Sequence, residues 1–179
     1  MHPVGQFEIR PARPADIPEV RRMLEEYVAW IGLDLAFQGI DAELDELPGD
    51  YIPPRGALFV AEDRGLSAEA RSAKVDRLLG MIGLRPLEER ACLAGAYDSK
   101  AGEMKRLFVR PGARGRGLAR QLIAAALAEA RRLQYAEIRL DTLPMMGDAQ
   151  TLYTSLGFHD IAPYYDTPIA GTRFMSKTL

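Results

Sequence analysis

The chain has 179 residues, a length that fits one domain with a buried core, and we expect a single domain over 1–179. It is 47% hydrophobic and 27% charged, which is ordinary for a soluble protein and excludes a disordered or fibrous chain. The net charge of −2 excludes a general polyanion-binding surface, and no apolar run reaches the roughly 20 residues of a membrane span. The single cysteine, Cys92, excludes an internal disulfide. We therefore expect no nucleic-acid partner, no membrane contact and a cytoplasmic location.

The first half of the chain is predicted to contain mostly strands and one strong helix. Phe7–Arg10 alternates like an edge strand. Asp16 and Glu19 form a capping-box pattern at the start of a helix whose apolar residues recur at helical spacing until Gly32. The remaining predictions are strands at 57–62 and 78–84, a short helix or loop at 34–38, weak helix at 41–47, an exposed hairpin loop at 63–77 and a short strand at 91–94.

The second half of the chain alternates strands with helices. Strands are predicted at 104–109, 136–142, 158–162 and 172–177, and helices at 117–133 and 149–156. The helix at 117–133 has the clearest inner stripe of leucine, isoleucine and alanine. The pattern predicts an α/β protein with a mixed sheet and helices on its faces.

The most informative segment is a glycine-rich turn between the strand at 104–109 and the following helix. Gly115 and Gly117 tolerate a positive φ there, and the first N–H groups of the helix have no internal partner. Together with the helix dipole, these amides predict a site for a phosphate or pyrophosphate. Five arginines lie in or beside the segment: Arg106, Arg110, Arg114, Arg116 and Arg120.

Three other interpretations of this turn are a plain turn, a P-loop and a dinucleotide-binding turn. A plain strand-to-helix turn explains the glycines but not the arginines. A P-loop needs Lys-Ser or Lys-Thr after its last glycine, where this chain has Leu118-Ala119. A dinucleotide-binding turn would use Asp141 for a ribose, but Arg120 stands at its third glycine position.

Two motifs carry a family resemblance. The segment 114–119, Arg-Gly-Arg-Gly-Leu-Ala, resembles the Arg/Gln-x-x-Gly-x-Gly/Ala signature of the GNAT N-acyltransferases, and Leu107–Pro111 resembles the strand and turn that precede it. The segment 149–158 resembles the family's second motif, with Leu152-Tyr153 and Gly157-Phe158 at the family's spacing. The chain is identified as a member of this superfamily.

The resemblance implies a GNAT fold, a mostly antiparallel mixed sheet splayed between its fourth and fifth strands, here Met104–Val109 and Glu137–Thr142. It also implies acetyl-CoA as a co-substrate and no metal. The residues implied to contact acetyl-CoA are Leu107, Phe108, Val109, Arg114, Gly115, Arg116, Gly117, Leu118, Ala119, Arg120 and Tyr153. Many members carry an asparagine seven residues before the motif tyrosine, where this chain has Met146.

Direct acetyl transfer to an amine needs a base, an oxyanion donor and an acid for the departing thiolate. Tyr153 is the predicted acid, although it also belongs to an apolar stripe of its helix that would place it in the core. Glu103 is the predicted base, with Asp141 as the alternative, and a solvated carboxylate is the plain interpretation of both. The predicted oxyanion donor is a backbone N–H near Phe108.

The predicted acceptor is a small-molecule or amino-acid-like primary amine. Aromatic residues expected on the acceptor side are Tyr27, Trp30, Phe37, Tyr51, Tyr164 and Tyr165. Acids that could attract an ammonium group are Asp34, Asp41, Asp45 and Asp166. Cys92 is expected to be a small buried hydrophobe, and His2 and His159 lack the partners of a metal site. A homodimer is left open, as is the alternative function of a catalytically silent acyl-CoA-binding module.

Overall fold

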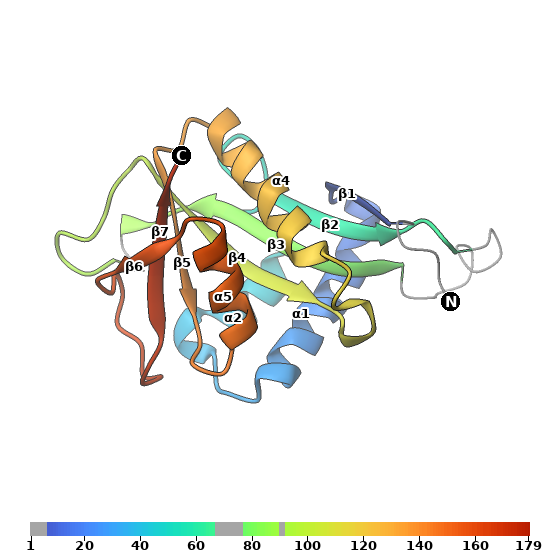
Figure 1. The fold of residues 1–179 in the computed structure, drawn as a ribbon, viewed down its shortest axis with the longest axis horizontal. Coiled ribbons are helices and arrows are strands. Elements are labelled where there is room, and N and C mark those ends of the chain that lie inside the picture. Colours follow the sequence, from blue (N-terminus) through green and yellow to red (C-terminus); the bar gives the residue numbers. More distant parts are fainter. Residues whose placement is uncertain (1–6, 67–76, 90–91) are drawn as a thin grey trace.

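A seven-stranded sheet in the order β1-β2-β3-β4-β5-β7-β6 runs through the structure (Figure 1). The computed structural model describes residues 7–66, 77–89 and 92–179. Every neighbouring pair of strands is antiparallel except β4 and β5, which are parallel. The strands are β1 (Phe7–Pro11), β2 (Ala57–Asp63), β3 (Leu78–Pro86), β4 (Ala101–Val109), β5 (Glu137–Thr142), β6 (His159–Ile161) and β7 (Arg173–Thr178).

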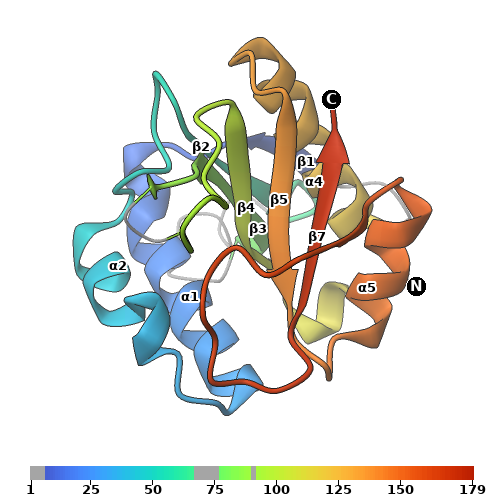
Figure 2. The same cartoon turned by 90° about the vertical axis from the view of Figure 1, so that its left-hand side faces the viewer.

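Helices cover both faces of the sheet, as Figure 2 shows. Helices α1 (Ile17–Ile31) and α2 (Ile40–Glu46) lie on one face, and α4 (Leu118–Arg132) and α5 (Gly147–Ser155) lie on the other. Each face has its own apolar core, because the predicted stripes of α1 and α4 are buried against the sheet. The predicted fold class is confirmed, and no helix of the described ranges is both long and apolar enough to cross a membrane.

The parallel strands β4 and β5 part after a short ladder. Only three residue pairs join them, and the last is Glu103 with Arg139. Beyond that pair, β4 continues to Val109 beside β3, while β5 continues to Thr142 beside β7. The predicted splay between these two strands is therefore confirmed, and it leaves a wedge between the outer halves of β4 and β5.

A β-bulge lies in β4 where the wedge begins. Met81 of β3 faces Phe108 and Gly83 faces Lys105, so β4 has one residue more than β3 over this stretch. Arg106 takes up the extra residue with a φ of 60°, which is unusual for a residue with a side chain. The bulge bends β4 just where its side chains reach the wedge.

Two local predictions are wrong. Asp16 and Glu19 do not form a capping box: Asp16 accepts hydrogen bonds from Arg10 and from the Arg13 amide, and Glu19 accepts one from the Leu78 amide. Both acids bind partners outside the helix instead of its free N–H groups. The strand predicted at 91–94 is also absent, since the described part, 92–94, is a bend and a turn. Most of the loop predicted at 63–77 lies outside the described residues.

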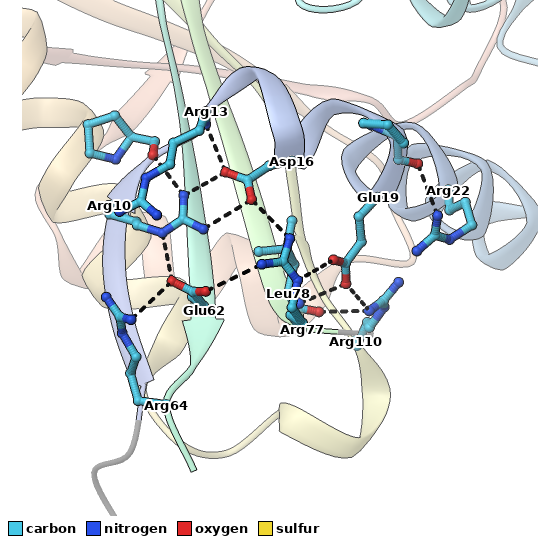
Figure 3. A network of polar contacts seen from close by, with 12 residues as sticks. Arg10, Arg13, Asp16, Glu19, Arg22, Glu62, Arg64, Arg77, Leu78 and Arg110 are labelled. Carbon is cyan, nitrogen blue, oxygen red and sulfur yellow. Dashed lines mark hydrogen bonds and ion pairs between the residues drawn. The ribbon is translucent and has the colours of Figure 1, made fainter. Parts of the chain in front are cut away.

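A buried network of charged side chains connects α1 to three strands (Figure 3). Arg10 of β1 donates to Asp16 at 2.6 Å and to Glu62 of β2 at 2.8 Å. Arg110, which follows β4, donates to the Leu78 carbonyl at 2.8 Å and reaches Glu19 at 3.3 Å. The network therefore fixes the start of the glycine-rich turn against α1 and β3.

We predict that Asp16→Asn lowers the free energy of unfolding by about 3 kcal/mol at pH 7, because the buried Arg10 loses one of its two carboxylate partners and keeps only Glu62. Burial by itself would raise the pKa of Asp16, but the hydrogen bonds of Arg10 and Arg13 and the charges of Arg10 and Arg77 hold that pKa below its ordinary value. Because the pKa of Asp16 is lower in the folded state than in the unfolded state, its carboxylate stabilises the fold at pH values above the ordinary carboxyl pKa of about 3.9. This contribution is lost as the pH falls through the lowered pKa of the folded state.

Urea unfolding at several pH values checks this expectation. The difference between the wild type and Asp16→Asn should shrink below about pH 4. Asp45→Asn is the matched control, since it breaks an exposed ion pair with Arg21 and should cost less than about 1 kcal/mol. Equal losses in the two variants, or a loss from Asp16→Asn that persists at low pH, would contradict the role of the network.

Candidate functional site

A cleft of about 620 Å³ lies where the glycine-rich turn meets α4 and the start of α5. We call it the glycine-turn cleft. Nine of the eleven residues predicted to contact the cofactor line it: Leu107, Phe108, Val109, Arg114, Gly115, Gly117, Leu118, Ala119 and Arg120. The other two are Arg116 and Tyr153, which lie elsewhere.

The backbone of the turn is suited to an anion. Gly115 and Gly117 have φ values of 74° and 76°, which favour glycine, and a Cβ at either position would meet open space. Among the described residues, no acceptor binds the N–H groups of Gly115, Arg116 or Gly117. The first amides of α4 follow directly, so consecutive free donors line the edge of the cleft.

Two of the five arginines in or beside the segment do not line this cleft and bind acidic residues instead. Arg106 is buried and donates to the Glu43 carboxylate of α2, with two hydrogen bonds from its Nε and one of 2.8 Å from its Nη2. Arg110 binds Glu26 of α1 at 2.7 Å. Both acids come from helices far away in the sequence, so each arginine serves to attach a helix to β4.

The other three arginines lie around the turn in different ways. Arg114 and Arg120 line the cleft. The guanidinium of Arg114 lies 4.8 Å from the ring centre of Trp30, and that of Arg120 donates to the Ser155 hydroxyl at 3.0 Å. Arg116 points away from the cleft and lies over the ring of Phe7 at 5.6 Å.

A second, smaller cavity of about 40 Å³ lies deeper in the wedge, and we call it the junction cavity. Leu107, Met146 and Ala149 line both it and the glycine-turn cleft, so the two spaces adjoin. Tyr153 of α5 lines the junction cavity. No described residue hydrogen-bonds its hydroxyl, and burial raises the pKa of Tyr153, so the phenol stays protonated at neutral pH.

An ion pair spans the wedge beside the junction cavity. Lys105 Nζ of β4 lies 2.6 Å from Asp141 Oδ1 of β5, two residues beyond the last pair of the ladder on each strand. Burial alone would raise the pKa of Asp141, but the charge and hydrogen bond of Lys105 and the charge of Arg106 lower that pKa below its ordinary value. Gln38 approaches the other oxygen of Asp141 at 3.4 Å.

A third cavity of about 410 Å³ lies on the other side of this ion pair, and we call it the tyrosine cavity after Tyr164 and Tyr165. Lys105 and Gln38 line both it and the junction cavity. Glu103 lines the tyrosine cavity and is fully engaged there. It accepts hydrogen bonds from Arg85 at 2.9 Å and from the Tyr164 hydroxyl at 2.8 Å.

The aromatic residues predicted for the acceptor side are spread over four places. Phe37, Tyr164 and Tyr165 line the tyrosine cavity, as expected. Tyr27 lines the junction cavity, and Trp30 lies at the glycine-turn cleft. The sixth, Tyr51, is buried in the core beside α2, and its hydroxyl donates to Glu43.

Of the four acids expected on the acceptor side, the structure places only Asp166 in the tyrosine cavity. Asp34 accepts a hydrogen bond from the Ala36 amide, Asp45 binds Arg21, and Asp41 is exposed on α2. Cys92 is half-buried and also lines the tyrosine cavity.

Several polar residues of the site were missed from the sequence, among them Gln38, Arg85 and Lys105. Lys105 carries a usable signal, because it lies two residues after Glu103 on the same face of a strand. Arg85 and Gln38 come from segments whose approach to β4 depends on the tertiary fold, so no local pattern identifies them.

The family model of the acetyltransferase (GNAT) domain matches residues 54–160, which is more than half of the chain. The chain belongs to the GNAT acetyltransferase family. An uncharacterized N-acetyltransferase of Schizosaccharomyces pombe is 33% identical over 162 residues, covering 90% of this chain and 88% of that protein. The resemblance stated from the two motifs is therefore confirmed.

Solved structures show the same fold. A GNAT-family acetyltransferase of Staphylococcus aureus Mu50 superimposes with a TM-score of 0.69 at 17% identity, covering 96% of this chain and 98% of that one. A protein of Salmonella typhimurium solved with its cofactor acetyl-CoA gives a TM-score of 0.65 at 19% identity, covering 97% and 94% of the two chains. The glycine-turn cleft of this GNAT chain lies between the family's two motifs, since it is bordered by the turn at 114–119 and by Ala149 and Leu152.

We predict that Gly117→Ala lowers the free energy of unfolding by about 1 kcal/mol, because alanine is strained at a φ of 76°. Gly112→Ala is the matched control in the same turn. Its added Cβ also meets open space, and Gly112 does not have a positive φ, so this substitution should be nearly neutral. Chemical unfolding of both variants measures the difference. Equal stabilities would contradict the left-handed conformation assigned to Gly117.

Proposed function

We propose that this chain transfers an acetyl group from acetyl-CoA to a primary amine of a small-molecule or amino-acid-like acceptor. The observation that carries the proposal is the continuity of the three cavities. Leu107 and Met146 connect the glycine-turn cleft to the junction cavity, and Lys105 and Gln38 connect the junction cavity to the tyrosine cavity. A thioester entering from one side and an amine entering from the other would meet at the junction.

The glycine-turn cleft has the chemistry that acetyl-CoA requires. The free amides of 115–117 and the start of α4 would hold the pyrophosphate, with Arg114 and Arg120 at the edge of the cleft. Leu107 and Met146 offer apolar contacts to the pantetheine arm. The small volume of the junction cavity, about 40 Å³, favours a short acyl group.

The catalytic roles follow from what lines the junction cavity. Acetyl-CoA supplies an acyl carbon that is open to attack by a neutral amine. As the nitrogen–carbon bond forms and the carbon–sulfur bond breaks, sulfur keeps the electron pair of the broken bond. We assign Tyr153 the role of proton donor to sulfur, because it lines the junction cavity and its raised pKa keeps the phenol protonated over the neutral range.

The surplus proton of the amine needs an acceptor, and two carboxylates compete for this role. Asp141 lines the junction cavity beside Tyr153, and it is ionised because Lys105 lowers its pKa. Glu103, the base predicted from sequence, opens onto the tyrosine cavity and has both oxygens bonded to Arg85 and Tyr164. Their positions support Asp141 as the proton acceptor and Glu103 as the residue that positions Tyr164 and Arg85.

The tyrosine cavity supports an amine with an apolar part as the acceptor. Its acids are Glu88, Glu103 and Asp166, against the bases Arg85 and Lys105, so an ammonium group is favoured over an anion. Phe37 and Leu93 are partly exposed at this cavity and offer apolar contacts. Aliphatic and aromatic primary amines are therefore the first acceptors to test.

Cofactor binding is tested by thermal unfolding with CoA, with acetyl-CoA and with NAD as a control. A ligand at about 100 times its dissociation constant adds roughly 2.7 kcal/mol, which raises the midpoint by roughly 5 to 11 °C in a domain of this size. A shift with the CoA ligands and none with NAD is expected. Thiol release from acetyl-CoA in the presence of a panel of primary amines then tests turnover. Binding without thiol release for any amine would favour the silent acyl-CoA-binding module.

We predict that Tyr153→Phe lowers kcat by about 10²-fold and leaves the thermal shift with CoA unchanged, because only the proton donor is removed. The Tyr153 ring packs edge-on against Phe158 with centres 5.6 Å apart, and phenylalanine preserves that contact. Thiol release at saturating acetyl-CoA provides kcat. Unchanged turnover in this variant would exclude Tyr153 as the acid without affecting the family assignment.

We also predict that Asp141→Asn and Glu103→Gln have different effects. Asp141→Asn should lower kcat by about 10²-fold at neutral pH, because it removes the group that accepts the proton. Glu103→Gln should mainly raise KM and lower stability, since Arg85 loses its buried carboxylate. Steady-state kinetics give kcat and KM of both variants, and thermal unfolding gives their stabilities. The reverse pattern would return the role of base to Glu103.

A further inference from the structure

One buried polar atom stands out in the wedge. Thr142, the last residue of β5, is almost completely buried, and its hydroxyl is the one side-chain polar atom among the described residues that is buried without a hydrogen-bond partner. A buried hydroxyl without a partner costs free energy, so native structures satisfy nearly all of them. Thr142 is one of the residues that line the junction cavity, so a ligand in that cavity lies close to this residue.

In several other threonines of the described chain, the hydroxyl donates a hydrogen bond to a nearby backbone carbonyl. Thr151 and Thr154 donate to carbonyls one helical turn earlier, and Thr172 donates to the Ile169 carbonyl. In an extended strand no carbonyl one helical turn earlier comes within reach of a side-chain hydroxyl, because the chain rises about 3.3 Å per residue. The hydroxyl of Thr142 therefore depends on a partner from outside its own segment.

The strand places Thr142 on a definite side of the sheet. Side chains alternate along β5, and Thr142 shares a face with Ile138 and Leu140, which belong to the core beneath α4 and α5. Tyr153 belongs to the same core. Asp141 lies on the opposite face and binds Lys105. Thr142 and Asp141 therefore line the junction cavity from opposite faces of β5.

We infer that the Thr142 hydroxyl donates a hydrogen bond to the acyl carbonyl oxygen of the bound thioester. This inference rests on the proposed function. Thr142 lines the junction cavity but not the glycine-turn cleft, so it lies at the acyl end of the ligand and not along the pantetheine arm. Leu107, Met104 and Met146 line the same small space without a side-chain donor. Among the other donors that line it, Lys105 and Gln38 bind Asp141, Arg106 binds Glu43, and Tyr153 is the proposed proton donor.

The hydrogen bond would matter most during transfer. When the amine nitrogen bonds to the acyl carbon, negative charge grows on the carbonyl oxygen and falls again as the carbon–sulfur bond breaks. A fixed donor at that oxygen stabilises the transition state more than the bound thioester, and removal of one such donor costs about 10²-fold in kcat or more. Thr142 keeps its own proton throughout, so it acts beside the proton donor Tyr153 without replacing it.

The test compares Thr142→Val, which keeps the shape and removes the hydroxyl, with Thr142→Ser, which keeps the hydroxyl. The first readout is the melting temperature without ligand. Because the wild-type hydroxyl has no partner, Thr142→Val should melt at or above the wild-type temperature. The second readout is the infrared carbonyl band of bound acetyl-CoA labelled with ¹³C at the carbonyl. That band should lie at lower frequency in the wild type and in Thr142→Ser than in Thr142→Val.

The third readout is thiol release with 2-phenylethylamine as the acceptor, where Thr142→Val should lose about 10²-fold in kcat and Thr142→Ser much less. The affinity for CoA, which has no acyl group, should be equal in all three proteins. An identical carbonyl band in the wild type and Thr142→Val would overturn the inference and leave the proposed function standing. A wild type whose melting temperature does not respond to CoA or acetyl-CoA would overturn the proposed function and the inference with it.

Discussion

The structure depends on the point where β4 and β5 stop pairing. Their ladder ends at Glu103 and Arg139, and the next residues on the facing sides, Lys105 and Asp141, replace backbone pairing with a side-chain ion pair at 2.6 Å. Beyond this pair β4 and β5 no longer hold each other by backbone hydrogen bonds, so other strands have to keep them in place. The support comes from the antiparallel neighbours β3 and β7, which keep β4 and β5 paired on their outer edges along their full length.

Because side chains alternate along the two strands, apolar and charged residues of the wedge lie on opposite faces. On one side lie Thr142 and Tyr153, and Tyr153 belongs to the apolar core beneath α4 and α5. On the other side lie Glu103, Lys105 and Asp141, whose charges are balanced within the protein. In the proposed function, the anion of the ligand would be met mainly by backbone amides of the glycine-rich turn, which need no counter-ion of their own. An anionic cofactor and a cationic acceptor would then bind at separate places.

The elements of the fold could be predicted because their signals are local. The stripe of α4, the alternation of β5 and the turn residues Gly115 and Gly117 each show in a window of a few residues, and two motifs at the right separation identified the family. The partners of charged residues could not be predicted in this way. Arg106 binds Glu43 and Arg10 binds Glu62, partners that are 63 and 52 positions away. The capping box failed for the same reason, because Asp16 and Glu19 gain more from buried arginines and the Leu78 amide than from the exposed start of their own helix.

Nuclear Overhauser contacts between acetyl-CoA labelled with ¹³C in its acetyl methyl group and the methyl groups of the protein test the central claim most directly. Met146 and Leu107 line both the glycine-turn cleft and the junction cavity, whereas Leu93 lines the tyrosine cavity. The account predicts contacts from the acetyl methyl group to Leu107 and Met146 and none to Leu93. Contacts to Leu93 instead, or an acetyl group that contacts neither Leu107 nor Met146 while CoA is bound, would contradict it.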